Sequence, residues 1–304
     1  MEVFLMKQIL SWFFITLLVS GCQSNPPKEK SLPSSSGIST ATAKSSEPKL
    51  CEKCVTLGNR ASLKKALVIG NSQYEHQGLN NPVNDATDMA NLLADDMGFH
   101  VIRALNLDYG EMKKVIDDFR ELLASTPDKS EEKVGLFYYS GHGARSNQDK
   151  NYLLPINNGK IRGNYELRRQ AIQVKSEIVA PLEKANNGVN IIVADACRDN
   201  PYEGSGKGSN KRGLIPISPS SATPQKMGAV VAFAASAGEV ADDGTQRNGL
   251  YTKHLLAKMK ELKHERIESV FKKVYEPVVR ESNQEQHPSY ASSLTTDYCV
   301  GGCQ

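Results

Sequence analysis

A histidine and a cysteine in this chain stand at the ends of two apolar runs, an arrangement suited to nucleophilic chemistry. The run that starts at Val134 ends on His142, which lies between two glycines, and the run that starts at Asn190 ends on Cys197. Each run has the length and the β-branched or aromatic content of a buried strand. If both strands end at one edge of a sheet, the imidazole can take the thiol proton and the thiolate can attack a carbonyl carbon. The pair is therefore a candidate for acyl-transfer catalysis.

Strand-like runs and helix-like periodicity alternate from about residue 63 onward, and this pattern must position the pair. Alternation of this kind predicts an α/β fold with a mostly parallel sheet of about six strands and helices on both faces. Sites in such sheets lie at the carboxyl ends of the strands, where His142 and Cys197 both stand. The expected strands are 65–71, 98–105, 134–142, 190–197, 228–236 and 294–300, with a short extended piece at 152–155. One helix is expected from Asn84 or Asp85 to about Met97, and another starts at residue 176. The other expected helices are 112–123, about 250–262 and about 265–281.

The composition excludes some other classes of protein. The chain has 304 residues, 39% of them hydrophobic, so it can build a substantial core. Its net charge is only +3, and the lysines and arginines are scattered among acidic residues, which argues against nucleic acid as a partner. Neither a phosphate-binding loop nor a Rossmann glycine fingerprint is present, and this argues against a nucleotide enzyme.

Residues 1–21 have the order of an export signal. Lys7 precedes an apolar run at 9–19, small residues follow at 20–21, and then comes Cys22. This order resembles the bacterial lipobox, which implies a lipoprotein signal and lipidation of Cys22. The expected location is the bacterial cell envelope, facing the periplasm, with the membrane contacted through the lipid; Gln23 weakly favours the outer membrane. An uncleaved anchor or an ordinary signal peptide is the alternative.

The remainder of the chain divides into a tether and a folded domain. Residues 22–60 contain the Ser-, Pro- and Lys-rich stretch up to about residue 50 and a C-x-x-C, and are expected to form a flexible tether. Residues 61–304 are expected to form the catalytic domain. Within it, the stretch at about 203–227 is rich in Gly, Ser, Pro and Lys and is predicted to be a long linker loop.

Four of the six cysteines form two close pairs at the ends of the folded part. They are Cys51 and Cys54 in a C-x-x-C, and Cys299 and Cys303 in a C-x-x-x-C. In an exported protein, disulfides are expected, either between the two pairs or within each pair; a four-thiolate zinc site is the competing interpretation.

The segments Tyr138–Gly143 and Asp195–Arg198 together resemble those of the caspase and metacaspase clan of cysteine peptidases. The resemblance covers about residues 65–300 and is supported by Asn84-Asp85-Ala86 and by the stretch 248–252. The 55 residues from His142 to Cys197 are close to the caspase spacing, although D-A-C-R-D departs from the animal caspase motif and is closer to metacaspases and bacterial caspase-like domains. The resemblance implies a three-layer caspase-like sandwich.

The same resemblance assigns chemical roles. Cys197 would be the nucleophile of a cysteine endopeptidase and His142 its base, with the backbone amides of Gly143 and Cys197 as the oxyanion hole. No cofactor is required for this chemistry, and no metal ligands are assigned. Metacaspases often need calcium; Asp242 and Asp243 are only loose candidates for such a site.

The resemblance also implies a specificity. Asp85, Ser140 and Asp195 match the residues that line the S1 pocket of metacaspases, so cleavage after Arg or Lys is expected. Asp85 could instead cap a helix, and Asp195 could simply bind nearby backbone. With basic specificity, Lys207, Lys211 and Arg212 in the linker loop become candidate autoprocessing sites.

Two other functions compete with that of an endopeptidase acting on peptides or proteins. One is a catalytically silent caspase-like binding or scaffold module at the cell envelope. The other is a redox protein that uses Cys51 and Cys54, which is weak because the C-x-x-C does not open a helix after a strand. The sequence does not specify the oligomeric state.

Overall fold

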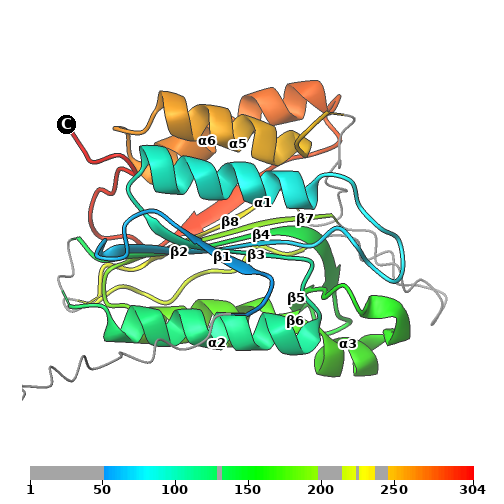
Figure 1. Ribbon diagram of the computed structural model, residues 1–304. Helices are drawn as coiled ribbons and strands as arrows, with labels where there is room; N and C mark the ends of the chain where they lie inside the picture. The colour runs from blue at the N-terminus through cyan, green and yellow to red at the C-terminus, as the bar shows by residue number, and fades with distance from the viewer. Residues whose placement is uncertain (1–50, 129–131, 198–213, 224–225, 237–245) are drawn as a thin grey trace, which may run out of the picture. The chain divides into compact units, whose positions relative to one another are not determined.

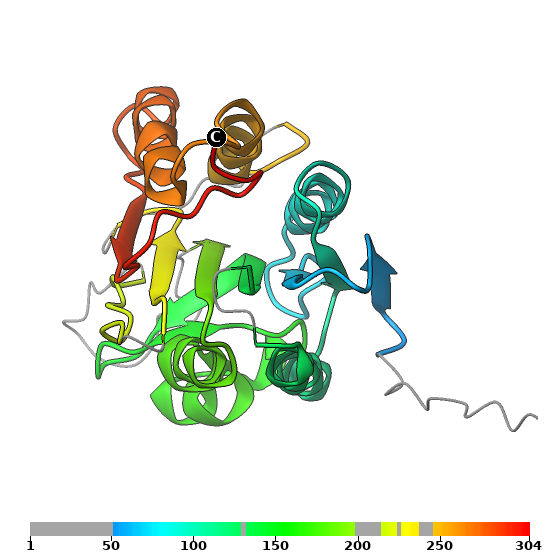
Figure 2. The same cartoon turned by 90° about the vertical axis from the view of Figure 1, so that its left-hand side faces the viewer.

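The main sheet lies between two layers of helices, as Figures 1 and 2 show. The computed structural model describes residues 51–128, 132–197, 214–223, 226–236 and 246–304. Over these residues a nine-stranded sheet runs in the order β1-β3-β2-β4-β7-β8-β9, and β5 and β6 extend from β4 off this path. The strands are β1 (Cys54–Leu57), β2 (Lys64–Gly70), β3 (His100–Leu105), β4 (Val134–Arg145), β5 (Asn151–Leu153), β6 (Ile172–Gln173), β7 (Val189–Cys197), β8 (Ala229–Phe233) and β9 (Ser289–Ser292).

The central strands β3, β2, β4, β7 and β8 are parallel, and β1 and β9 close the edges as antiparallel strands. The expected α/β architecture, with a mostly parallel sheet, is therefore confirmed. β4 and β7 form the centre, and both are almost wholly buried, which explains why they read as continuous apolar runs rather than alternating ones.

Each face of the sheet carries its own apolar core. On one face, side chains of β4 and β7 pack with α1, α5 and α6; on the other, they pack with α2 and α4. Figure 1 shows these two helical layers on opposite sides of the strands. The helices are α1 (Pro82–Asn91, continued by a π-helical turn η1, Leu92–Asp96), α2 (Tyr109–Ser125), α3 (Asn164–Gln170), α4 (Ala180–Ala185, preceded by the π-helical η3, Val174–Val179), α5 (Leu250–Glu261) and α6 (Ile267–Glu281), with a short 3-10 turn η2 at Asn158–Lys160.

The expected helices form, and their ends have local causes. The Asp108 carboxylate accepts a hydrogen bond from the Glu111 backbone amide at 2.8 Å, and the Glu111 carboxylate accepts one from the Asp108 backbone amide at 2.9 Å. This capping box explains why α2 begins before Met112, where the sequence analysis expected it. α1 begins at Pro82, earlier than Asn84 or Asp85, because proline suits the first helical turn.

Two strand assignments differ from expectation. Residues 294–300 do not form the last strand; β9 lies earlier, and Tyr298 and Val300 are buried in the core with α6, whose Ile267 amide donates to the Tyr298 carbonyl at 2.8 Å. The segment pairs only through an isolated antiparallel bridge between Cys299 and Arg266, and the apolar side chains of Tyr298 and Val300 pack on helices. β1 lies in the range 22–60 that the sequence predicted as tether, and it pairs with β3.

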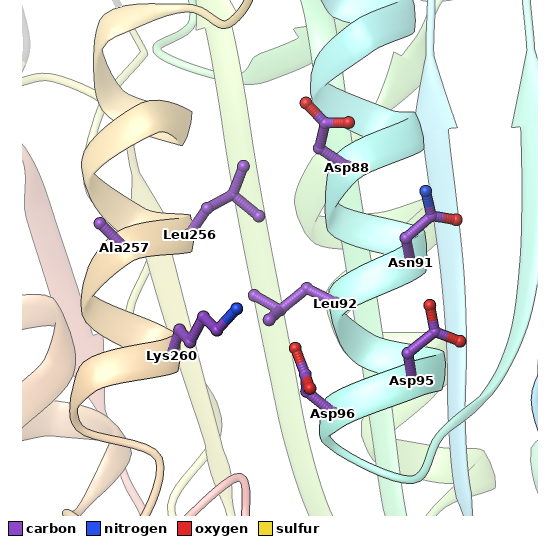
Figure 3. Close-up of a pocket in the computed structure, with 8 residues that line it drawn as sticks. All are labelled: Asp88, Asn91, Leu92, Asp95, Asp96, Leu256, Ala257 and Lys260. Carbon is purple, nitrogen blue, oxygen red and sulfur yellow. The ribbon is translucent and has the colours of Figure 1, made fainter.

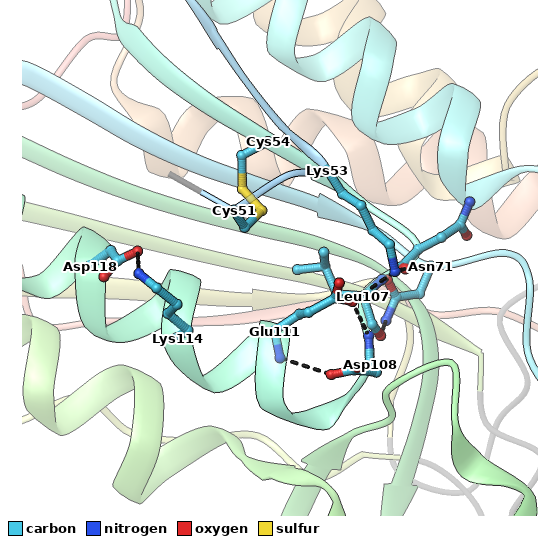
Figure 4. Close-up of a disulfide and its surroundings, with 10 residues drawn as sticks. Cys51, Lys53, Cys54, Asn71, Leu107, Asp108, Glu111, Lys114 and Asp118 are labelled. Carbon is cyan, nitrogen blue, oxygen red and sulfur yellow. Dashed lines mark hydrogen bonds and ion pairs between the residues drawn. A yellow bond between two sulfur atoms is a disulfide. The ribbon is translucent and has the colours of Figure 1, made fainter. Parts of the chain in front are cut away.

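The cysteine pairs close locally, as Figure 4 shows for the first. Cys51 bonds to Cys54 and Cys299 bonds to Cys303, so bridges between the pairs and a shared four-thiolate zinc site are both wrong. Over the described ranges, no three His, Cys, Asp or Glu side chains converge as metal ligands. The described helices include none that is long and apolar enough to cross a membrane.

Candidate active site

The register of β4 and β7 brings the two reactive positions side by side. His142 and Cys197 are directly opposite each other as the last residue pair of this parallel ladder. Neighbouring strands lie about 4.8 Å apart. Two positions earlier, Ser140 is opposite Asp195. Because alternate residues of a strand share a face, positions 140 and 142 of β4 lie on the same face as positions 195 and 197 of β7.

The imidazole of His142 is buried and held by the loop that follows β2. Its Nε2–H donates to the carbonyl oxygen of Gln77 at 2.5 Å. The ring of Tyr74 packs against it with centroids 4.4 Å apart, and the Tyr74 hydroxyl accepts the His142 backbone N–H at 2.7 Å. In a neutral imidazole whose Nε2 carries the proton, Nδ1 is the basic nitrogen. The arrangement therefore fixes both the ring and its tautomer.

Gly141 makes room for this arrangement. Its φ is +153°, and a Cβ there would lie 2.4 Å from the Tyr74 hydroxyl and 2.7 Å from the Tyr139 hydroxyl. The Tyr139 hydroxyl also lies 2.9 Å from the carbonyl oxygens of His142 and Leu154. Two tyrosine hydroxyls thus occupy the space that any side chain at position 141 would need.

Asp85 and Asp195 meet beneath the same edge of the sheet. Asp85 is only 1% exposed and Asp195 is 7% exposed. Asp85 accepts hydrogen bonds from the Ser140 hydroxyl at 2.9 Å and from the Gly249 amide at 3.0 Å. The structure therefore brings Asp85, Ser140 and Asp195 together. The interpretation of Asp85 as a helix cap is wrong, because its carboxylate accepts hydrogen bonds from Ser140 on β4 and from Gly249, the residue before α5, and not from the backbone of α1.

Burial governs the charge of this acidic pair. Burial, and then the nearby negative charge of Asp195, raises the pKa of Asp85 to about 8. The hydrogen bonds from Ser140 and Gly249 act in the opposite direction, but they are the smaller effects. With no cation present, the pair therefore resists carrying two negative charges at neutral pH, and an approaching cation would favour full ionisation.

Two side chains to which the sequence analysis gave no role, Thr252 and Tyr138, join Asp85, Ser140 and Asp195 in a group that we call the acidic cluster. Thr252, wholly buried in the first turn of α5, donates to the Asp195 carboxylate at 2.6 Å. The hydroxyl of Tyr138 lies 2.5 Å from the Thr252 hydroxyl. The stretch 248–252 gave a sequence signal for Thr252, but its role depends on a partner 57 residues away.

The segment before α5 is fastened to α1. Arg247 makes a bidentate ion pair with Asp88, at 2.9 and 2.8 Å, and Asn248 donates to the same carboxylate at 2.9 Å. Asn84 donates to the Arg247 carbonyl at 3.0 Å. These bonds place the Gly249 amide at Asp85.

A groove of about 340 Å³ lies between α1, η1 and α5 (Figure 3). Asp88, Asp95 and Asp96 line it opposite Lys260. The Asp88 carboxylate is already bound by Arg247, and none of the five predicted S1 and catalytic positions lines this groove.

Several predicted sites lie outside the described residues. They are Cys22, the candidate autoprocessing residues Lys207, Lys211 and Arg212, and the calcium candidates Asp242 and Asp243. Gln77 was missed by the sequence analysis, because it acts through a backbone carbonyl that any residue could supply.

Comparison with known families identifies the domain that carries this site. The Caspase domain family matches residues 63–299. The chain belongs to the caspase domain family. This is a family of cysteine peptidases that act on proteins, and the resemblance found in the sequence is confirmed at that level.

Relatives of this caspase domain are distant. The human protein "Mucosa-associated lymphoid tissue lymphoma translocation protein 1" is 32% identical over 142 residues, which cover 46% of this chain and 16% of the human protein. The chain therefore matches only a small part of that relative's length.

Solved structures show the same fold. A protein of Geobacter sulfurreducens superposes with a TM-score of 0.55 at 20% identity, over 79% of this chain and 97% of that one. Caspase-1 of Spodoptera frugiperda superposes with a TM-score of 0.54 at 17% identity, over 81% of this chain and 92% of that one. The caspase-like sandwich expected from the sequence is therefore confirmed.

Proposed function

We propose that this caspase domain is a cysteine endopeptidase in which Cys197 is the nucleophile and His142 the base. The observation that carries the proposal is the register that sets these residues opposite each other at the carboxyl end of β4 and β7. Family membership supports the class of reaction, and the geometry around His142 supports its role as a proton acceptor.

The proposed reaction has two halves. In the first, the Cys197 thiol gives its proton to Nδ1 of His142, and the sulfur attacks the scissile carbonyl carbon. The C–N bond then breaks, and the amine leaves with the proton from His142, so that an acyl-enzyme remains. In the second, water loses a proton to His142 and attacks the acyl carbon; the C–S bond breaks and the thiol is restored.

The oxyanion of each tetrahedral intermediate is assigned to the backbone amides of Gly143 and Cys197. The pairing of β4 with β5 supports this for Gly143. The Leu154 amide donates to the His142 carbonyl at 2.9 Å, and opposite residues in an antiparallel pair alternate between bonded and non-bonded. The Gly143 amide is therefore directed away from β5, toward the β7 side of β4, where Cys197 ends the ladder.

Cleavage after Arg or Lys is the proposed specificity. Asp85 and Asp195 supply two buried carboxyl groups close to the proposed nucleophile, and Ser140 orients the first of them. A guanidinium or ammonium group would supply the positive charge that this pair needs to ionise fully. A substrate with Asp in the same position would add a third acidic group and be rejected.

An activity-based probe tests this proposal directly. An arginyl peptide with a thiol-reactive electrophile should label the wild-type chain, fail to label Cys197→Ala, and label His142→Ala slowly. His264→Ala removes a histidine whose ring binds the Gly302 carbonyl, and it should label like the wild type. Absence of Cys197-dependent labelling, with no peptide cleaved, would instead indicate a silent binding module.

Export as a lipoprotein is proposed on the sequence of residues 1–22. Radiolabelled palmitate should enter the wild-type chain and not Cys22→Ala when both are expressed in a bacterium. Equal labelling of the two proteins would overturn this assignment.

A further inference from the structure

Asn158, in η2, binds the backbone of the loop that holds His142. It is fully buried. Its side-chain oxygen accepts the His76 backbone N–H at 2.9 Å, and its side-chain nitrogen donates to the His76 carbonyl at 3.0 Å. The amide thus pairs with both polar groups of one residue, as a neighbouring strand would, and fixes the backbone of His76.

The residues around Asn158 strengthen this attachment. The Glu75 amide donates to the Ile156 carbonyl at 2.8 Å. The Gly159 amide donates to the Glu75 carboxylate at 3.1 Å, and a Cβ at Gly159 would lie 2.5 Å from that carboxylate. The stretch from Ile156 to Gly159 therefore holds Glu75 and His76 through backbone and side chain together.

Gln77 follows immediately and has an unfavourable backbone conformation. Its φ is 57°, in the left-handed region that residues with a side chain rarely adopt. Such a conformation persists when the surroundings determine it. Its carbonyl oxygen lies 2.5 Å from Nε2 of His142, so the conformation delivers an acceptor to the proposed base.

We propose that Asn158 is a positioning residue for His142. By fixing His76, it holds the Gln77 carbonyl against Nε2, keeps the ring proton there, and leaves Nδ1 to accept the thiol proton of Cys197. The inference rests on the proposed function, because it concerns the base of that reaction. Asn158 itself does not touch the reacting atoms.

The amide chemistry of Asn158 suits this role. An asparagine offers a donor and an acceptor in one short side chain, whereas an aspartate offers only acceptors and an alanine neither. Asn158→Asp should keep the bond from the His76 amide and lose the bond to its carbonyl. The adjacent Asn157 is a matched control, because its oxygen accepts the Tyr109 amide at the start of α2 and does not bind this loop.

Nitrogen NMR of the full chain, with ring-labelled histidine, tests the inference without relying on catalysis. The His142 signals are assigned by their loss in His142→Gln. In the wild type and in Asn157→Ala, His142 should be in the Nε2–H form. In Asn158→Ala it should become a mixture of the two tautomers, with Asn158→Asp between them. An unchanged His142 tautomer in both folded Asn158 variants would overturn the inference.

Kinetics per titrated active site provide a second readout. Asn158→Ala should lower kcat by about 10- to 100-fold while KM stays within about twofold, because the base is misplaced but the substrate pocket is intact. A purely structural role would lower the melting temperature and the number of active sites, but leave kcat per site unchanged; that result would also overturn the inference. If Asn158→Ala does not fold, Asn158→Asp decides by the same two measurements.

The two proposals fail separately. If the wild-type chain cleaves no peptide, the proposed function fails, and the histidine spectra still decide whether Asn158 controls His142. If the wild type is active and the spectra do not respond to Asn158, only the positioning role fails.

Discussion

Asp195 precedes Cys197 by two positions on β7, so a carboxylate of the acidic cluster and the proposed nucleophile occupy alternate positions of the same strand. The same spacing relates Ser140 to His142 on β4. A strand rises about 3.3 Å per residue, which puts the acidic cluster within about 7 Å of the proposed chemistry along each strand. That is the reach expected between an anchored basic side chain and its scissile bond.

Removal of one carboxylate should weaken selection for basic residues. Asp85→Asn is expected to lower kcat/KM for an Arg substrate by roughly 100-fold, because a desolvated charge partner is lost. A P1-scanning peptide library measures this. Asp118→Asn makes the same charge change on α2, in an ion pair with Lys114, and should leave the preference unchanged. An unaltered preference in Asp85→Asn would contradict the assignment of S1.

Binding of a basic ligand should depend on pH near neutrality. The pKa of Asp85 is raised to about 8 by burial and by Asp195, so the carboxyl group is protonated below that pH and attracts cations weakly. Affinity for an arginine-based inhibitor should therefore increase as the pH rises from about 6 to about 9, with uptake of the ligand releasing a proton. Calorimetry in buffers of different ionisation enthalpy measures the proton. A pH-independent affinity would count against the acidic pair as the binding site.

The same carboxyl group should make folding stability depend on pH. Its folded pKa of about 8 is above its unfolded value of 3.8, so the folded state binds more protons in this interval. The stabilisation from this group is then complete at pH below 3.8 and is lost as the pH rises toward 8. The free energy of unfolding of the wild type, relative to that of Asp85→Asn, should accordingly fall over this interval in denaturant titrations. A constant difference would show that Asp85 ionises normally.

Gly141→Ala should disturb the tyrosine pair behind His142. A Cβ at this position would be 2.4 Å from the Tyr74 hydroxyl, so a loss of about 2–4 kcal/mol is expected. Gly98 also has a positive φ, of +72°, but nothing lies within 4 Å of a Cβ there. Gly98→Ala should therefore lose only about 1–2 kcal/mol, from the backbone conformation alone. If thermal unfolding shows the same loss of stability for Gly141→Ala and Gly98→Ala, then Tyr74 and Tyr139 move aside without an energetic penalty, which would contradict this prediction.

If the chain cuts itself among Lys207, Lys211 and Arg212, its two fragments should stay together. β8, on the later fragment, pairs with β7 on the earlier one. Asn151 binds both backbone groups of Ile215, at 2.9 and 2.7 Å, and the Glu183 carboxylate accepts from the Ser220 amide and hydroxyl at 2.8 and 2.7 Å. Mass spectrometry should find two fragments that co-elute in gel filtration.

Cys197→Ala should remain intact under the same conditions. An intact wild-type chain that cleaves peptides would end the proposal of autoprocessing.

Sequence alone located the centre of the sheet and the reactive positions, because buried parallel strands give continuous apolar runs. It could place His142 and Cys197 at one edge, and the structure adds that β4 and β7 are neighbours in register. It could not identify Gln77, because this residue contacts His142 through its backbone carbonyl, which every residue type has. It misplaced the last strand, because Tyr298 and Val300 alternate like strand residues while packing on helices. The four residues of β1 were too few to register as a strand.

The supports of His142 come from the 74–77 loop and η2, whereas the partners of Asp85 and Asp195 come from β4 and from the start of α5 and the segment before it. The residues proposed to bind the substrate side chain and the proposed base are therefore held by different elements around the same strand pair, β4 and β7. Under the proposed function, exchange of residues in the acidic cluster should redirect cleavage toward other side chains while the imidazole keeps its setting, which would make this domain a framework for engineered proteases.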